Sequence, residues 1–487
     1  MTLKGLITTT CCLFLLGLAS SVNAMEFDKV TVPLQHPANG NIVQLNNSNS
    51  LLVSGFNQFE RWLTKVDLAD YSSKLLVIPE DAQYFTTARL AQHDKQQLVF
   101  LGSSGIYRYD SSQHSNELLL ATESMFRVVD EARLRSRDFS VDLGSGLSDF
   151  LLPDFSHFHL YRQQPDGSFN HFALPVSARI QAWNNNRADY SARRFFQLDV
   201  NGNGLTDLLF VEDGRFSVFL QQSNGDFATS PYYPDWPVLL STERQADQRS
   251  DAGRSYSGQS IVSLNDITDL DGDGIPDLVL SRENIADALD RSSSFEIFFG
   301  QMSEQGLQFS TTADTRINVD SVPTEVVIAD FNGDGRKDFY IPTTNIGLST
   351  IIRVLVRGSA NLDIDFYLLD ANRSYPVKAD FRQRATIDVS ISNLRFDMPL
   401  FELADLNNDG KKTLVVGEGG SQLRFYEPDS SRLFSRRSEQ VNLDLPRDSS
   451  RVRVMDLNGN GKQDIILPFD SLDKEANRNQ LQLLFSR

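Results

Sequence analysis

Cysteine is nearly absent from this chain of 487 residues, because the only two, Cys11 and Cys12, both lie in its first 24 residues. If that segment is removed, no disulfide can form, so other interactions must hold the fold together. Basic residues are also in deficit, with 46 Lys and Arg against 64 Asp and Glu and a formal net charge of -18. A nucleic-acid-binding surface needs clustered Lys and Arg, so we expect no nucleic-acid partner.

Residues 1–24 have the layout of a secretory signal peptide. Lys4 supplies a positive charge, the apolar run Leu13–Leu18 follows, and small residues end at Ala24. We predict cleavage after Ala24 and a secreted or periplasmic protein that consists of residues 25–487. The apolar run is shorter than the roughly 20 residues that cross a bilayer, and no later stretch reaches that length, so we expect no membrane span in the mature chain.

A nine-residue pattern recurs five times between residues 199 and 464. It begins with Asp, has Asn or Asp at its third and fifth positions and Gly at its sixth, and in four copies ends with Asp. The copies begin at Asp199, Asp269, Asp330, Asp405 and Asp456. Their irregular spacing argues against a solenoid of identical coils and favours units of one size with loops of different lengths.

Each copy is followed by a continuous apolar run, such as Leu208–Val211 or Ile465–Leu467. Short β-prone runs bounded by turn residues predict buried strands, and an alternating strand and often a hairpin come next. Each unit is therefore interpreted as a four-stranded antiparallel meander. Weaker copies near residues 142, 94 and 47 bring the number of units to eight.

The last unit ends after its third strand, while Val30–Val32 forms a strand with no unit of its own. Pairing of these two segments would close a ring and leave no open sheet edge. We predict an all-β fold: a β-propeller of eight four-stranded antiparallel blades, closed by pairing of the N-terminal strand with the last blade. Seven blades are the alternative. The propeller forms a single domain over residues 25–487, with the clearest repeats in residues 190–470.

The nine-residue loops offer oxygen atoms around one point. Positions 1, 3, 5 and 9 carry side-chain oxygens, position 7 offers a backbone carbonyl, and the glycine at position 6 allows a sharp turn. Such ligands suit Ca²⁺ better than Mg²⁺, which demands a tighter octahedron. An EF-hand is excluded because its bidentate Glu at position 12 is replaced by apolar residues. The candidate ligands are Asp199, Asn201, Asn203, Leu205 and Asp207; Asp269, Asp271, Asp273, Ile275 and Asp277; Asp330, Asn332, Asp334, Arg336 and Asp338; Asp405, Asn407, Asp409 and Lys411; and Asp456, Asn458, Asn460, Lys462 and Asp464.

These units resemble the FG-GAP/VCBS repeats of β-propellers, which include the propeller of integrin α subunits. The resemblance rests on five well-formed copies and implies that each loop joins the first and second strands of a blade and binds Ca²⁺, at about four to five sites. Thr413 departs from the pattern, because the loop that begins at Asp405 lacks its final carboxylate. From the number of carboxylates, we expect the loop at Asp269 to bind Ca²⁺ most tightly and the loop at Asp405 most weakly.

Histidine is scarce, but His157 and His159 would share one face of a strand. A hairpin centred on Asp166–Gly167 would place His171 opposite Arg162, on the other face, so we predict no zinc site. The sequence identifies neither a Ser/His/Asp triad nor a pair of catalytic carboxylates. A binding protein is therefore favoured over an enzyme.

Long insertions fall in connections that a propeller of this kind places on the face opposite the calcium loops. They span 176–192, 231–258, 281–293, 342–349 and 374–398. Residues 183–187 with Tyr190, and residues 231–237, offer aromatic and amide groups that suit a sugar ring or a protein loop, with packing at blade edges as the alternative. We expect a calcium-binding extracytoplasmic module that acts in binding, adhesion or protein interaction through a protein or glycan ligand on that face. The alternatives are a calcium-stabilised carbohydrate-active enzyme or lectin, and a purely structural subunit.

Overall fold

The computed structural model describes the chain from residue 25 onward with several gaps. It covers residues 25–45, 49–127, 133–182, 188–243, 245, 258–286, 291–319, 322–323, 326–344, 358–390, 395–397 and 399–487. The expected signal peptide, the weak loop near residue 47 and the segment 183–187 lie outside these residues. Within them, no helix has both the length and the apolar character needed to cross a bilayer.

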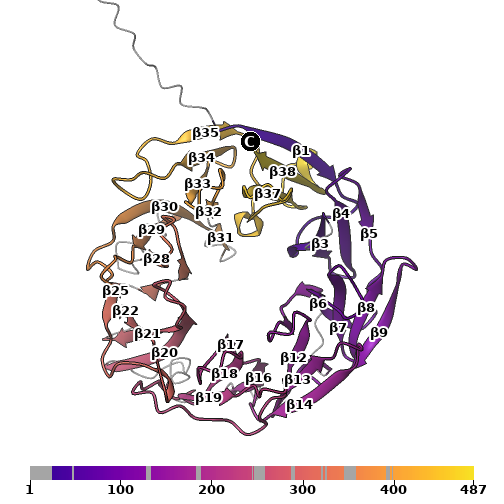
Figure 1. The fold of residues 1–487 in the computed structure, drawn as a ribbon. Helices are drawn as coiled ribbons and strands as arrows, with labels where there is room; N and C mark the ends of the chain where they lie inside the picture. The colour runs from indigo at the N-terminus through magenta and orange to yellow at the C-terminus, as the bar shows by residue number, and fades with distance from the viewer. Residues whose placement is uncertain are drawn as a thin grey trace, which may run out of the picture.

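The strands form eight blades arranged in a ring (Figure 1). Blade 1 contains β2 (Ile42–Leu45), β3 (Ser50–Phe56), β4 (Arg61–Asp67) and β5 (Ser73–Leu75). Blade 2 contains β6 (Ala82–Ala88), β7 (Gln97–Gly102), β8 (Gly105–Asp110) and β9 (Ser115–Ala121), and the short β10 (Arg135–Ser136) pairs in parallel with β6. Blade 3 contains β11 (Ser140–Val141), β12 (Asp149–Pro153), β13 (Phe158–Gln163) and β14 (Phe169–Leu174). Blade 4 contains β17 (Phe195–Leu198), β18 (Asp207–Glu212) and β19 (Arg215–Phe219), and a single bridge from Val218 to Tyr232 marks its outer edge.

The second half of the ring has longer strands. Blade 5 contains β20 (Gln259–Thr268), β21 (Asp277–Ile285), β22 (Arg291–Phe298) and β25 (Thr315–Val319). Blade 6 contains β26 (Val322–Pro323), β27 (Val327–Ala329), β28 (Asp338–Thr344), β29 (Ser359–Tyr367), β30 (Phe381–Ser390) and β31 (Arg395–Asp397). Blade 7 contains β32 (Phe401–Ala404), β33 (Thr413–Glu418), β34 (Gln422–Tyr426) and β35 (Glu439–Asn442). Blade 8 contains β36 (Arg453–Met455), β37 (Asp464–Phe469), β38 (Gln480–Ser486) and β1 (Phe27–Pro33).

Smaller elements lie in the connections. Two hairpins are formed by β15 (Arg179–Ala182) with β16 (Ala188–Ser191), and by β23 (Gln301–Ser303) with β24 (Gly306–Gln308). The 3-10 helices are η1 (Met125–Arg127), η2 (Ser449–Arg451) and η3 (Glu475–Asn477).

Ring closure occurs in blade 8, where the first and last strands of the chain are neighbours. The two strands are antiparallel, and their register runs from Phe27 opposite Ser486 to Pro33 opposite Gln480. The predicted all-β propeller of eight blades, with closure by the N-terminal strand, is therefore confirmed.

The core consists of apolar layers between neighbouring blades. The described residues form eight apolar clusters, each of which joins one pair of adjacent blades. In β18, Leu208 and Phe210 face blade 3, while Leu209 between them faces blade 5. The second strand of a blade is thus buried on both faces, as its continuous apolar run predicts.

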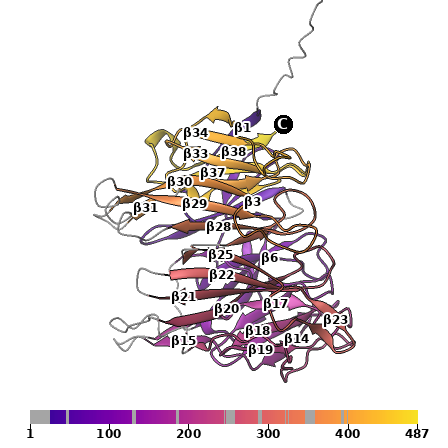
Figure 2. The same ribbon diagram turned by 90° about the vertical axis from the view of Figure 1, so that its left-hand side faces the viewer.

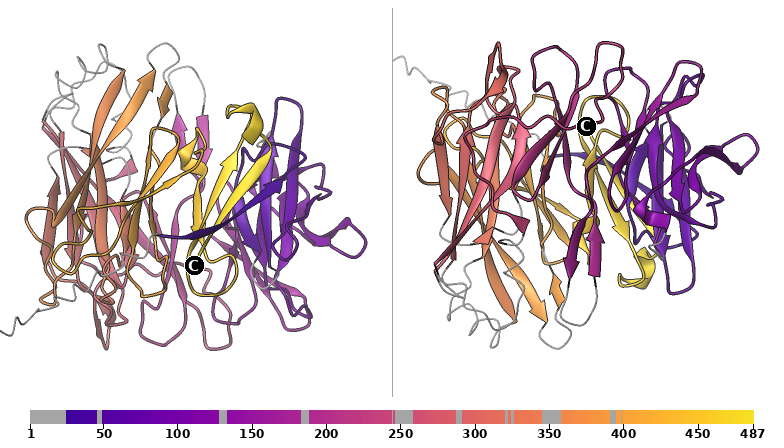
Figure 3. Two further views of the ribbon diagram at one scale, coloured as in Figure 1. Left: turned by 90° about the horizontal axis from the view of Figure 1, so that it is seen from above. Right: turned by 90° about the horizontal axis from the view of Figure 1, so that it is seen from below.

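Alternating strand direction gives the ring two different faces. Connections from the first to the second strand of a blade, and from the third to the fourth, lie on one side, which we call the repeat-loop face. Connections from the second to the third strand, and from blade to blade, lie on the opposite face. Figure 2 shows β23 on one side of the ring and β15 and β31 on the other, and Figure 3 shows the magenta β15–β16 hairpin projecting from the face opposite the repeat loops.

Two of the expected insertions are not simply loops on the opposite face. Much of 281–293 extends β21 and β22, and much of 374–398 forms β30. Residues 374–380 belong to the connection from β29 to β30, which lies on the repeat-loop face. Longer strands therefore contain residues that were expected to lie in loops.

Val32 tests the importance of ring closure, because it is fully buried between blades 8 and 1. We expect Val32→Asp to lower the free energy of unfolding by about 3 kcal/mol or more, since it buries an unpaired charge. Urea denaturation measures this change. Lys29→Asp, at an exposed position of the same strand, is the control and should leave the denaturation midpoint almost unchanged. Equal midpoints for the two variants would contradict the role of closure.

Candidate calcium sites

All five repeat loops occupy the same place in their blades. They join β17 to β18, β20 to β21, β27 to β28, β32 to β33 and β36 to β37, which are the first and second strands of blades 4 to 8. This is the position that the family resemblance implies, and it puts all five loops on the repeat-loop face.

The first carboxylate of each loop organises the turn around itself. Asp269 accepts hydrogen bonds from the backbone N–H groups of Gly272 at 2.7 Å and Gly274 at 2.9 Å. Asp199, Asp330 and Asp456 accept the equivalent bonds in their own loops. The glycines at the fourth and sixth positions have φ between 74° and 84°, a left-handed conformation that glycine adopts without strain.

The third and fifth side chains repeat this arrangement on a smaller scale. The third side chain accepts the backbone N–H of the fifth residue, and the fifth side chain accepts that of the seventh. Three oxygen-bearing side chains are thus held on one side of each turn, with lone pairs left over for a cation.

The ninth residue forms a buried clasp between the loop and the third strand of its blade. Asp277 accepts the N–H of Leu270 at 2.7 Å and that of Gly300 at 2.9 Å. Asp207, Asp338 and Asp464 make the same pair of contacts in their blades. Burial raises the pKa of Asp207 to about 6 and the pKa of Asp277 and Asp338 to about 7. Because each carboxylate oxygen keeps a second lone pair, these contacts are compatible with ligation of Ca²⁺.

The loop at Asp269 carries the densest negative charge. Asp269, Asp271 and Asp273 bring one carboxylate oxygen each within 4.8 Å of one another, and no other repeat loop brings three carboxylates this close among the described residues. Arg373 reaches this loop from blade 6, with Nε 2.5 Å from Asp271 Oδ2 and an NH2 group 2.7 Å from Asp273 Oδ2. Oδ2 of Asp271 is buried, and the Arg373 guanidinium is the cationic group that lies against it. The donor set therefore fits a hard cation, and a guanidinium group partly neutralises it.

The loop at Asp405 differs from the others in two residues. Asn408 takes the place of the first glycine with φ of 60°, a conformation that Asn tolerates better than most residues. Thr413 is buried at the ninth position and supplies no carboxylate. Asp405 and Asp409 nevertheless keep the bonds of the turn, so the loop retains its shape with fewer ligands.

The aromatic segment 231–237 is only partly exposed, because Trp236 is buried. Trp236 is buried between blades 4 and 5, and its indole N–H donates to the carbonyl of Leu307 at 2.7 Å. Tyr232 pairs with β19 at the blade edge and is 42% exposed, and Tyr233 is 60% exposed. Blade-edge packing is therefore the correct interpretation of Trp236, and the expectation of an exposed aromatic surface was wrong for this residue.

Two features of these sites could not be read from the sequence. The backbone donors to the clasp, such as Gly300 and Leu369, lie in segments that carry no pattern of their own. Arg373 is 100 positions from Asp273 in the chain, so only the packing of blade 6 against blade 5 brings the two together. No local signal could have found either.

Comparison with known proteins agrees with this architecture. The FG-GAP-like repeat model matches residues 269–341 and 405–467. Together with the eight blades and their loops, these matches show that the chain is a β-propeller that contains FG-GAP-like repeats. None of the curated proteins matches it.

Two solved structures give distant likenesses. A lectin of Agrocybe aegerita, described as specifically recognising non-reducing terminal N-acetylglucosamine, has 14% identity and a TM-score of 0.42, with 88% of this chain and 96% of that chain covered. A protein from Lactobacillus plantarum has 10% identity and a TM-score of 0.34, with 86% and 97% covered.

Substitution in two loops tests the ranking of the sites. We expect Asp271→Asn with Asp273→Asn to remove most of one site's calcium-dependent stabilisation, which amounts to about 2.7 kcal/mol when Ca²⁺ is 100-fold above its Kd. Thermal unfolding with Ca²⁺ and with EDTA measures the effect. The matched pair Asp405→Asn with Asp409→Asn should change the melting temperature much less, and equal shifts would contradict the ranking.

The buried clasp carboxylates predict how stability depends on pH. Their folded-state pKa values lie above the ordinary 3.8, so the protonated form is favoured in the folded protein. This stability is fully present below the ordinary pKa and is lost as pH rises through about 6 to 7. In EDTA we therefore expect the melting temperature to fall between about pH 5 and pH 8. Bound Ca²⁺ offsets the charge of the ionised carboxylates, so the difference in melting temperature between the calcium-loaded and the EDTA-treated protein should widen over this interval. A calcium-free melting temperature that rises over this interval would contradict the prediction.

Proposed function

We propose that this propeller is a calcium-stabilised, extracytoplasmic binding module that takes a protein or glycan ligand on the face opposite its repeat loops. Calcium is supported by the donor geometry of the repeat loops and by the match of residues 269–341 and 405–467 to the FG-GAP-like repeat model. The location outside the cytoplasm is supported by the signal-peptide layout of residues 1–24 and by the absence of cysteine from the rest of the chain.

The observation that carries the binding role is a groove on the opposite face. It has a volume of about 700 Å³, which lies in the range of ligand-binding pockets. We call it the blade 6–8 groove, because its walls are β30, the turn from β33 to β34, the connection from blade 7 to blade 8, and the loop from β37 to β38. Its polar lining includes Gln383, Arg384, Glu418, Arg424, Tyr426, Asp444, Arg447, Asp473, Lys474 and Asn477.

Most charges of the groove are arranged in opposite pairs. Arg384 lies 2.7 Å from Asp363, and Arg424 and Lys474 pair with Glu418 and Asp444. Arg447 has no ion pair among the described residues and is available to a ligand. A groove with balanced charge, hydrogen-bonding groups on its walls and the ring of Tyr426 suits a neutral or weakly charged polar ligand, such as a glycan or a peptide loop.

An enzyme is the second candidate, because several charged side chains line the same groove. Glycoside hydrolysis needs a carboxylic acid that keeps its proton near neutral pH. Hydrogen bonds from Lys474 and Asn477 lower the pKa of Asp444, so this carboxylate is ionised and suits hydrogen-bond acceptance rather than acid catalysis. A converging set of charges at the centre of the ring would have favoured the enzyme. The groove instead lies between blades 6 and 8, outside that centre.

A ligand screen tests the proposal. The protein, loaded with Ca²⁺, is applied to a glycan array and to an array of secreted proteins, and we expect a specific ligand whose binding falls at least about tenfold in Arg447→Glu, because charge reversal in a contact costs several kcal/mol. Arg436→Glu is the matched control, since Arg436 is exposed on the repeat-loop face. EDTA should weaken binding by loosening the loops.

Three outcomes would contradict the proposal. Ligand binding with equal affinity in both variants would place the contact elsewhere. Folded, calcium-loaded protein with no ligand on either array would favour a structural subunit. Hydrolysis of a bound glycan would favour the enzyme.

A further inference from the structure

The register of β13 and β14 places two histidines side by side that were expected on opposite faces of blade 3. His159 is opposite Ala173 and Tyr161 is opposite His171, so His159 and His171 lie on the same face of blade 3. His159 Nδ1 lies 2.9 Å from His171 Nε2. The expectation that His171 faces the other side, opposite Arg162, was therefore wrong.

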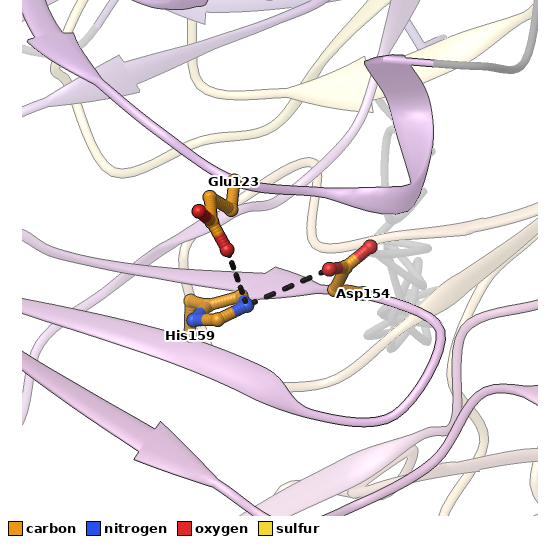
Figure 4. A group of neighbouring side chains, drawn as sticks. All are labelled: Glu123, Asp154 and His159. Atoms are coloured by element: carbon orange, nitrogen blue, oxygen red, sulfur yellow. Dashed lines mark ion pairs between the residues drawn. The ribbon is translucent and has the colours of Figure 1, made fainter.

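The second nitrogen of His159 faces two carboxylates (Figure 4). Nε2 lies 3.7 Å from Oδ2 of Asp154 and 4.0 Å from Oε2 of Glu123. Asp154 follows β12, and Glu123 lies in the connection from blade 2 to blade 3, so all three groups meet on the face opposite the repeat loops. Their ligand atoms lie within 4.8 Å of one another.

These distances suit an ion between the groups better than direct contact. Separations of 3.7 and 4.0 Å are too long for hydrogen bonds, which need about 3 Å. In a tetrahedral zinc site with bonds of about 2.0–2.1 Å, neighbouring ligand atoms are roughly 3.3 Å apart. The separations of the two carboxylate oxygens from Nε2 therefore exceed those of a shared ion by about 0.4 and 0.7 Å.

Burial makes this arrangement costly without a cation. His159 is only 6% exposed and Asp154 only 8% exposed. Oδ1 of Asp154 is buried and accepts no hydrogen bond from the described residues, and Oδ2 receives only a long contact of 3.4 Å from Arg127. A divalent ion would compensate both the unpaired oxygen and the buried charge.

The surroundings hold the imidazole in the form that binds metal. If Nδ1 of His159 donates to His171, the lone pair of Nε2 points to the carboxylates, which is the usual second-shell arrangement of a zinc-bound histidine. The ring of His171 stacks on Tyr161 with centroids 4.7 Å apart, and the Tyr161 hydroxyl accepts the N–H of Glu123 at 3.1 Å. His171 and Tyr161 are therefore positioning residues.

We propose that Glu123, Asp154 and His159 form a binding site for one divalent transition-metal ion of the zinc class, separate from the calcium loops. One imidazole and two carboxylates match zinc better than Ca²⁺, which prefers oxygen ligands alone. The side chain of Glu123 is 66% exposed, so the ion is reachable from solvent and keeps a coordination position for water or a ligand atom.

Zinc titration by calorimetry, with excess Ca²⁺ present to fill the loops, tests the site. We expect one Zn²⁺ per chain, with affinity reduced at least about tenfold in Glu123→Gln, Asp154→Asn and His159→Gln. Glu123→Gln changes an exposed side chain and should melt like the parent protein in the absence of zinc. Arg127→Gln removes a competing cation and should raise the affinity roughly two- to fivefold.

A second-shell variant and a loop variant complete the test. His171→Phe keeps the ring stacking but loses the hydrogen bond, and should weaken zinc binding about tenfold. Asp271→Asn with Asp273→Asn should bind zinc as the parent protein does. The proposal is overturned if the parent protein binds no Zn²⁺ with the calcium loops filled. It is equally overturned if Glu123→Gln and His159→Gln bind Zn²⁺ unchanged, because the three groups are then an ion-pair cluster only.

Discussion

Burial of each blade on both of its faces is the constraint on which the whole structure depends. A strand such as β18 sends Leu208 and Phe210 to one neighbour and Leu209 to the other, so no blade can be stable alone. Every apolar layer needs a blade on each side, and only a closed ring gives all eight blades two neighbours. The pairing of β1 with β38 completes the last layer, and it explains how a chain without cysteine beyond Cys12 can hold together.

The repeat loops connect this apolar framework to the metal chemistry through the ninth carboxylate. Asp277 ties the loop to the residue that follows the third strand, so the same side chain helps to fold the blade and stands ready as a ligand. The charge of Asp277 is buried, and a bound calcium ion would offset the free-energy cost of that burial. Folding of the loop and ligation of the ion require the same Asp, Asn and Gly residues at the same spacing. The motif can therefore be recognised from the sequence.

Features set by local pattern were predictable, and features set by register or by distant packing were not. The loops, the second strands and the closing strand follow from residues close together in the chain. His171 shows the limit: the turn spans Gln164–Ser168, with Gln164 bonded to Ser168, and pairs Gln163 with Phe169. The two-residue turn expected at Asp166–Gly167 would shift the register by one residue, and such a shift moves every side chain to the other face of the sheet. Trp236 was misjudged for a related reason, because its burial depends on the hairpin that carries Leu307.

The two faces of the ring have different physical requirements, and this difference favours ligand binding on the face opposite the repeat loops. On the repeat-loop face, the turn bonds prescribe similar residues in blades 4 to 8, and the clasp prescribes Asp in all of these blades except blade 7, so little freedom remains for recognition. The opposite face carries no such motif, and there the chain varies in strand length, hairpins and charged side chains. Both the blade 6–8 groove and the Glu123–Asp154–His159 cluster lie on it. Calcium on one face would hold the blades rigid, and a rigid scaffold preserves the geometry of a site built from several blades on the other.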